Sequence, residues 1–321
     1  MARHDRGQRM DRRTFLEGLV AGVASVPLAS FGAAQSGKSR VAVAERAGII
    51  AKGRIDRKVV KEAVDALVKK LSGKSNVDKA WRTFVSPKET VALKFNGLFR
   101  GGTTSPQVVW AVCRGLADAG VLQEKMIVLD RNRKDFDTAG LAAFEDLPKI
   151  RFLPADSQWD TEVKAGPVTT RITRILTEDA DAIINLPRLK NHPIAGVTIS
   201  MKNHLGSVPN GREYHGKIDS IAELNLLPPI RKKTRLAVCD AIVGIFDKGP
   251  SFSGPHVTWE ARSLLAATDV VALDAVGAEM IRKARLAKGA GPTRPRPTHI
   301  AHAAQMGLGT ADLERIEIVK A

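Results

Sequence analysis

The sequence predicts an α/β protein in which helices cover both faces of a mostly parallel sheet. Two patterns carry this expectation: short apolar runs of strand length alternate with longer segments of helical period, and the alternation continues to the end of the chain. Length is the third observation, because residues 35–321 suffice for a single α/β domain, built as one body or as two close lobes.

The expected elements follow one another along the chain. The run RVAVAE at 40–45 is typical of a strand, and the helix at 56–71 carries apolar residues on one face. In a second helix, Ser105 is the expected N-cap and Pro106 stands in the first turn. We expect strands at 40–45, 90–95, 126–130, 150–153, 169–175, 182–185, 235–243 and 316–319, and helices at 56–71, 105–119, 269–287 and 299–306.

Residues 1–34 are predicted to be a twin-arginine (Tat) signal peptide. Arg12 and Arg13 precede Thr-Phe-Leu, and the uncharged run that follows is too short and too weakly apolar for a comfortable transmembrane helix. We therefore expect export by the Tat machinery to a periplasmic or otherwise extracytoplasmic location, with no stable transmembrane span after cleavage. An amphipathic N-terminal helix is the alternative. Export in the folded state permits a cofactor or metal to be loaded first but does not require one.

The formal net charge of +16 favours anionic partners. Phosphates, carboxylates, polyanions and lipid headgroups all fit, and an arginine-rich, soluble surface explains the same surplus. Nucleic acid is not expected, because the chain has a single Tyr and no basic stretch interleaved with aromatic residues. Cys113 and Cys239 are the only cysteines, so this chain alone cannot hold an iron–sulfur cluster with four Cys ligands. Both lie in apolar runs that predict burial rather than a disulfide.

Polar residues follow several expected strands, and ligands in parallel sheets bind where the carboxyl ends of the strands meet. We call this region the carboxyl edge. Lys94 and Asn96 end one strand, and Asp240 is expected where another ends. The glycine-rich loop 97–106 predicts an anion cradle of backbone N–H groups at a helix N-terminus, although a plain strand-to-helix turn explains it equally well.

The stretch LPRLKNHPIAGVTISMKNHLG, residues 186–206, is rich in basic and polar side chains, and no acid occurs between Asp181 and Glu213. Its first half, with Lys190 and His192, is expected to be a loop after the strand at 182–185. Residues 195–205 fit either a strand or a helix, and we favour a helix that directs Lys202 to the carboxyl edge.

Other chemistries are weaker expectations. His192, His204 and His215 form a loose group that could bind a metal with Asp240 or Asp247, but their spacing matches no metal motif. The serine-hydrolase pattern GxSxG and the zinc pattern HExxH are both absent.

Two aspartates stand near the start of the helix expected at 269–287. Asp269 is expected to cap it. Asp274 falls among apolar residues and needs a partner, for which a lysine of the carboxyl edge is the natural candidate.

The motifs NLPRLKNHPIAGVTISMKNHLG, KFNG and LLAATDVVALDAV resemble the domain-of-unknown-function family 362 (DUF362) over nearly all of residues 35–321. In the family pattern a lysine stands where this chain has Arg188 and a threonine where it has Asn191. The resemblance implies an α/β fold but no established activity. Some relatives carry ferredoxin-like modules, which implies a redox or cofactor context and, for this chain, a redox partner protein. Its matching positions are Lys94, Asn96, Lys190, His192, Thr198, Lys202, Asn203, Asp240, Asp269 and Asp274.

Two functions are weighed. In the first, the carboxyl edge holds an anionic small molecule or a cofactor that carries a metal, and acts on it. Lys202, Lys190 and His192 are then the candidate catalytic residues, and the candidate ligand-binding residues are Lys94, Asn96, Arg188, Thr198, Asn203, Asp240 and Asp274. In the second, the protein is a non-catalytic binder of polyanions or of a partner protein. Its supports are Arg231, Lys232, Lys233, Arg282, Lys283, Arg285, Arg294 and Arg296.

Overall fold

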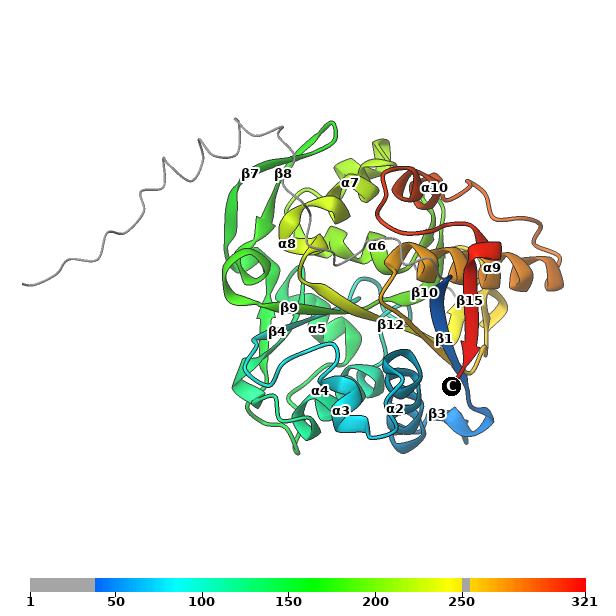
Figure 1. The fold of residues 1–321 in the computed structure, drawn as a ribbon. Coiled ribbons are helices and arrows are strands. Elements are labelled where there is room, and N and C mark those ends of the chain that lie inside the picture. Colours follow the sequence, from blue (N-terminus) through cyan, green and yellow to red (C-terminus); the bar gives the residue numbers. More distant parts are fainter. Residues whose placement is uncertain (1–37, 250–254) are drawn as a thin grey trace, which may run out of the picture. The chain divides into compact units, whose positions relative to one another are not determined.

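A large mixed sheet, mostly parallel, runs through residues 38–249 and 255–321, the part of the chain that this computed structural model describes (Figure 1). Its path is β15-β1-β14-β12-β9-β4-β5-β6, with β10, β11 and β13 attached beside β12. The strands are β1 (Ser39–Glu45), β4 (Val91–Phe95), β5 (Met126–Asp130), β6 (Arg151–Pro154), β9 (Ala182–Leu186), β10 (Arg188–His192), β11 (Gly196–Thr198), β12 (Thr234–Ile245), β13 (Thr258–Trp259), β14 (Ser263–Ala267) and β15 (Ile316–Lys320).

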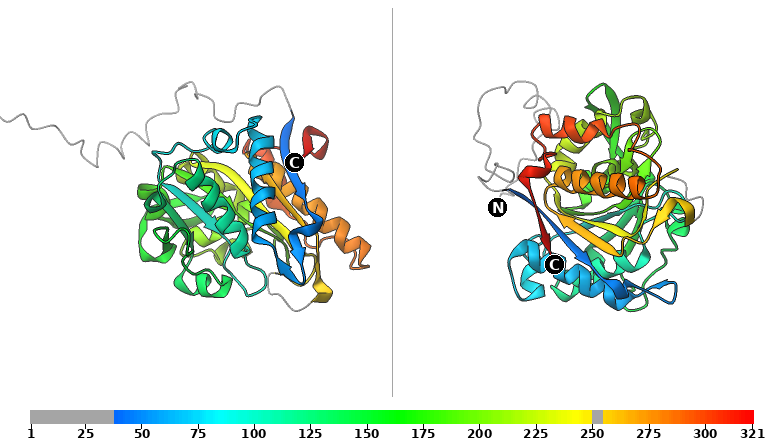
Figure 2. Two further views of the ribbon diagram at one scale, coloured as in Figure 1. Left: turned by 90° about the horizontal axis from the view of Figure 1, so that it is seen from below. Right: turned by 90° about the vertical axis from the view of Figure 1, so that its right-hand side faces the viewer.

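Helices cover both faces of this sheet, as predicted (Figure 2). One apolar core lies under α2 to α5 and the other under α6 to α10, because successive strand residues point to opposite faces. In β12, for example, Val238 faces the first core and Cys239 the second. The helices are α2 (Arg57–Ser72), α3 (Val77–Trp81), α4 (Pro106–Asp118), α5 (Arg133–Ala139), α6 (Ser200–Asn203), α7 (Ser220–Leu226), α8 (Pro228–Arg231), α9 (Val270–Ala287) and α10 (Thr298–Gln305).

Two small hairpins stand outside the large sheet. β2 (Ile50–Ala51) pairs with β3 (Arg54–Ile55), and β7 (Trp159–Ala165) pairs with β8 (Val168–Thr173). The strand predicted at 169–175 is therefore real but does not belong to the main sheet. Among the described residues, no helix has both the length and the apolar character needed to cross a membrane. The leader predicted at 1–34 lies outside the described residues.

Three sequence predictions around the site are wrong. The segment with Lys190 and His192 is strand β10 rather than a loop, because β12 and β11 pair with it on either side. Residues 195–205 contain both a strand and a helix. β11 ends before Ile199, whose backbone is neither extended nor helical, and α6 begins at Ser200. Asp240 lies in the middle of β12, since that strand continues to Ile245.

Strand β14 is an element that the sequence patterns missed. Its five residues are all buried between β1 and β12 and antiparallel to both. The run SLLAATDVVALDAV continues from this strand directly into α9, and hydrophobic period cannot divide such a run. Asp269 marks the boundary, where its side chain accepts hydrogen bonds from Val271 and Ala272 as the predicted N-cap.

Candidate functional site

A buried ion pair joins the ends of two parallel strands at the carboxyl edge. Lys94 of β4 donates to Asp130 of β5 over 2.7 Å, and the two side chains are 0% and 5% exposed. Lys94 also donates to its neighbour's carbonyl, Phe95 O, at 2.6 Å, while Asp130 accepts from the backbone N–H of Gly97. Lys94 is thus neutralised inside the protein.

Three asparagines bind the ion pair to α6. Asn203 accepts from Asn96 Nδ2 at 3.0 Å and donates to Asn185 Oδ1 at 2.7 Å and to Lys94 O at 3.0 Å. Asn185 in turn donates to Ser200 O at 2.9 Å. Each amide uses both its donor and its acceptor side, so Asn96 and Asn203, two predicted site residues, are brought together as a fixed framework.

A second buried cation, Arg188, is paired on the opposite face of the sheet. Its guanidinium donates to Asp240 Oδ2 over 2.7 Å and to the carbonyl of Val243. Asp240 also accepts from the hydroxyl of Ser105 at 2.5 Å and from its backbone N–H at 2.8 Å. The N-terminus of α4, where an anion cradle was predicted, is therefore occupied by the carboxylate of Asp240.

Lys190 is tied to the loop 97–104. Its ammonium donates to Asn96 Oδ1 and Gly102 O at 2.8 Å and to Leu98 O at 3.4 Å. Burial, with the charges of Lys202 and Arg188, lowers the pKa of Lys190 to about 7. Three oxygen acceptors match the three protons of an ammonium, so Lys190 holds the loop as a positioning residue.

Lys202 of α6 differs from the other three cations. Its ammonium lies 3.2 Å from His215 Nε2, and no carboxylate among the described residues forms an ion pair with it. The residue is 8% exposed, and burial lowers the pKa of its ammonium to about 8. An ammonium has three protons to donate, and here two have no acceptor in the described part of the chain.

His215 contacts Lys202, and the charge of Lys202 acts on two further imidazoles, those of His192 and His299. The rings of His192 and His215 are stacked with centroids 5.0 Å apart. Burial and the charge of Lys202 lower the pKa of His192 to about 2 and that of His299 to about 4, and lower the pKa of His215 as well. The rings of His192 and His299 are therefore neutral at pH 7. We call Lys202, His192, His215 and His299 the Lys202 site.

Two of these rings hold hydrogen-bonding atoms without a protein partner. His192 Nδ1 accepts from the N–H groups of Ile194 and Ala195, both at 3.1 Å, so Nε2 carries the proton of the neutral ring. No acceptor for that proton lies among the described residues. His299 is 0% exposed, and neither of its ring nitrogens has a hydrogen-bond partner among the described residues. Buried polar groups without partners are rare, because leaving such a group unsatisfied is unfavourable.

The predicted group of three histidines is only partly brought together, because His192 and His215 stack on each other and His204 has a different neighbour. His204 lies with Lys94, whose charge, after burial, lowers the pKa of His204 to about 3. Asp240 pairs with Arg188, and Asp247 with Arg285 at 2.5 Å. Within 38–249 and 255–321, no three side chains of the metal-binding types are grouped to hold an ion.

The remaining two predicted residues have clear positions. The sequence predicts a lysine as the partner of Asp274. Instead, its carboxylate accepts hydrogen bonds from the backbone N–H groups of Ser200 and Met201 at 2.7 and 3.0 Å. It thereby caps α6, the helix that carries Lys202. Burial raises the pKa of Asp274 to about 7. Thr198 lies opposite Lys190 across β10 and β11, and its buried hydroxyl has no hydrogen-bond partner in the part of the chain that the structure describes.

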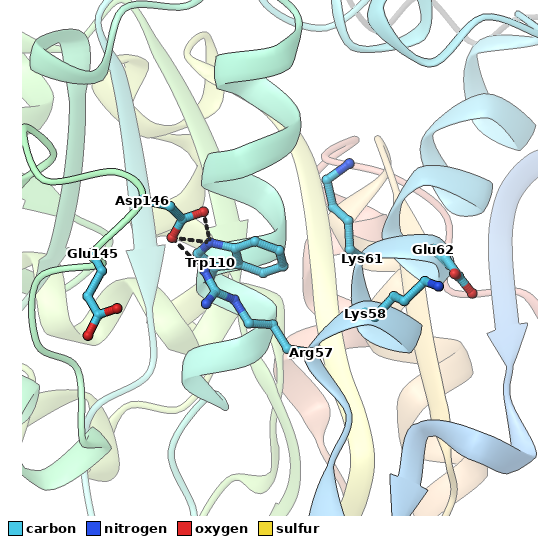
Figure 3. Close-up of a pocket in the computed structure, with 7 residues that line it drawn as sticks. All are labelled: Arg57, Lys58, Lys61, Glu62, Trp110, Glu145 and Asp146. Carbon is cyan, nitrogen blue, oxygen red and sulfur yellow. Dashed lines mark hydrogen bonds and ion pairs between the residues drawn. The ribbon is translucent and has the colours of Figure 1, made fainter.

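A separate hollow of about 650 Å³ lies at α2 and α4, on the other side of the sheet from α6 (Figure 3). There the Arg57 guanidinium stacks 3.5 Å from the centre of the Trp110 ring, and Asp146 accepts from both residues. These side chains satisfy one another, and none of the predicted site residues lines this hollow.

Sequence reasoning missed two members of the arrangement. Asp130 ends the strand next to that of Lys94, so its position at the carboxyl edge was a usable signal for the ion pair. His299 gave no local signal, because only the packing of α10 against α7 and α9 brings it near Lys202.

Comparison with known proteins matches a family to a region that contains Lys202, His192 and His215 but not His299. The family model described as "Domain of unknown function (DUF362)" matches residues 91–279. Thylakoid-associated protein sll1697 of Synechocystis sp. is 27% identical over 217 residues, which make up 62% of this chain and 65% of that relative's length. A crystal structure of a Thermotoga maritima protein is similar with a TM-score of 0.36 and 12% identity, over 58% of this chain and 50% of that one.

Proposed function

The chain belongs to the DUF362 family, and from that premise we propose that it binds an anionic small molecule at the Lys202 site. One observation carries the proposal: Lys202 is a buried cation whose polar partner in the described structure is an imidazole and not a carboxylate. Burying a charge without a counter-ion destabilises a fold, and a bound anion removes that cost. Phosphate and carboxylate groups suit it best.

The polar partners of the other cations in this region differ from those of Lys202. Lys94 and Arg188 have their own aspartates, and Lys190 has three oxygen acceptors. The unpartnered Nε2–H of His192 and the unpartnered ring of His299 supply neutral donors for the oxygen atoms of an anion. Binding by one ammonium and neutral rings favours a small ligand of low charge.

Titration calorimetry with inorganic phosphate and with acetate tests the proposal. Lys202→Met should weaken binding by at least about tenfold, since a hydrogen bond to a charged group contributes about 1.5–3 kcal/mol. Lys217→Met is the matched control, because Lys217 is exposed and lies two residues from His215, and its substitution removes the same charge. Equal weakening by both substitutions would contradict a site at Lys202.

Binding of polyanions over the surface is the second candidate. Some of the basic residues that support this candidate already have partners within the protein. Arg282 pairs with Glu279, Arg285 pairs with Asp247, and Lys233 donates to the carbonyls of Leu176 and Thr177. A salt titration separates the candidates, because surface binding weakens steeply with ionic strength and survives Lys202→Met.

We also propose that the protein is exported by the Tat machinery and acts outside the cytoplasm. The support is the sequence alone: the Arg12–Arg13 pair, Thr-Phe-Leu after it, and the weakly apolar run that follows. Replacing both arginines with lysine should leave the protein in the cytoplasmic fraction, whereas the unchanged chain should appear outside it. Equal export of both forms would exclude this route.

A further inference from the structure

We infer that Lys202 is a nucleophilic amine that forms an imine with a small 2-oxo acid, a carboxylic acid with an aldehyde or ketone carbonyl beside the carboxylate. This inference rests on the proposed function and names its ligand class. Three features of the Lys202 site carry it: the partner of the amine, the charges around it, and the donors left over for a carboxylate.

The partner of Lys202 can take its proton. A nearby carboxylate favours the charged form of a lysine, and an ammonium cannot attack a carbonyl. Lys202 instead lies 3.2 Å from His215 Nε2, and because an ammonium only donates, that nitrogen is the acceptor. Lys190 also has a lowered pKa, but it is 1% exposed and its three oxygen acceptors leave it no free position from which to meet a carbonyl compound.

The surroundings of Lys202 favour the neutral amine. It is 8% exposed, it contacts the imidazole of His215, and its charge acts on the imidazoles of His192 and His299. With burial lowering the pKa of Lys202 to about 8, at pH 7 it holds about 300-fold more neutral amine than a lysine with the ordinary pKa of 10.5. Lysines desolvated in this way are the ones that form Schiff bases with carbonyl substrates.

The leftover donors fit a carboxylate adjacent to the carbonyl. His192 Nε2–H points to no protein acceptor in the described structure, and its tautomer is fixed by two backbone N–H groups on Nδ1. His299 is fully buried with both ring nitrogens unpartnered. One ring nitrogen from each would bind the carboxylate, leaving the carbonyl carbon to Lys202.

The step balances without an oxidant or reductant. The Lys202 ammonium gives a proton to His215 Nε2, and the freed nitrogen lone pair attacks the carbonyl carbon while the carbonyl oxygen takes the proton that the attacking nitrogen then loses. The carbinolamine then loses its hydroxyl as water, with the proton returned by His215. One C=N bond forms and one C=O bond breaks, so amine and carbonyl give imine and water.

Reductive trapping tests this inference on the full chain. We would incubate it with glyoxylate or pyruvate and sodium cyanoborohydride at pH 7, which converts an imine into a stable secondary amine, and map the modified peptide by mass spectrometry. The expected result is one adduct on Lys202, at a rate on the order of 100-fold above that of the exposed Lys217. Adducts spread evenly over surface lysines would overturn the inference.

Variants separate chemistry from folding. Lys202→Arg keeps the charge and should abolish the adduct, and circular dichroism checks that it folds. His215→Gln should slow trapping and remove from its pH profile the loss of rate at low pH that protonation of His215 causes, which a merely structural role would not do. If phosphate binds in a Lys202-dependent way but no adduct forms, the imine is wrong and the proposed function stands; if neither occurs, both are wrong.

Discussion

Replacing Lys202 with methionine should stabilise the protein, because the substitution removes a buried charge that has no carboxylate partner within 38–249 and 255–321. Its ammonium has a pKa of about 8 against an ordinary value of 10.5. A difference of about 2.5 pKa units corresponds to about 3 kcal/mol of preference for the neutral form in the folded state. Methionine has a similar length and no charge, so at pH 7 the free energy of unfolding should rise by up to this amount.

The pH dependence gives the sign of the same effect. Between pH 8 and 10.5 the unfolded chain holds the proton of Lys202 more tightly than the folded protein does, so stability rises with pH over this window. The pKa of Lys190 is also lowered and contributes a similar rise. Because the charge of Lys202 also helps to lower the pKa of Lys190, the difference between the unchanged and Lys202→Met profiles reports Lys202 together with its effect on Lys190.

Urea unfolding followed by tryptophan fluorescence, from pH 7 to 10.5 and without added anions, measures both effects. Lys94→Met is the informative comparison, because breaking the buried pair with Asp130 should cost about 3–5 kcal/mol. Lys217→Met should change stability by less than about 0.5 kcal/mol. If Lys202→Met loses stability as Lys94→Met does, Lys202 has an internal counter-ion and the reasoning is refuted.

Three further predictions concern Gly206, Asp274 and Cys113. Gly206→Ala should destabilise the fold by about 2 kcal/mol or more in urea unfolding, because a β-carbon there would lie 2.8 Å from Lys94 Nζ; Gly216→Ala, with open space around it, should have little effect. The folded protein binds the Asp274 proton more tightly than the unfolded chain, so the stability of the unchanged protein should fall by about 4 kcal/mol between pH 3.8 and 7. Asp274→Asn should remove this fall, and an unchanged pH profile would argue against the raised pKa of Asp274. Cys113, fully buried with a raised pKa, should be alkylated by iodoacetamide only when the chain unfolds, and rapid labelling of the native protein would contradict its burial.

The fold class and most elements could be predicted, because period and capping are local properties. Strand Met126–Asp130 and the Ser105 and Asp269 helix starts are where the sequence predicts them. The failures lie where partners distant in sequence decide the structure. Residues 188–192 become a strand only because β12 pairs beside them, and a polar stretch carries no sign of such pairing.

The candidate site was predicted as a collection of residues but not as a pattern of pairing. The stretch 186–206 has no acid of its own, which made all its basic side chains look alike. Oxygen atoms from other elements distinguish them: Asp240 reaches Arg188 from the neighbouring strand, and Asn96 and the loop that follows it supply the acceptors of Lys190. Which basic side chain meets an oxygen acceptor depends on the sheet order, and no local pattern encodes that order.

Two aspartates also explain why the candidate site lies beside α6 rather than at a helix N-terminus. Helix N-termini attract anions, but here Asp240 caps α4 and Asp274 caps α6. The chain therefore fills these positions with its own carboxylates and holds Lys202, at the other end of the short helix α6, next to neutral rings. Residues of the family-matched region accordingly divide into two groups. Arg188, Lys190 and Asn203 keep the framework in place, so their loss should unfold the protein, whereas the loss of Lys202 should abolish ligand binding and leave a protein that is more stable than before.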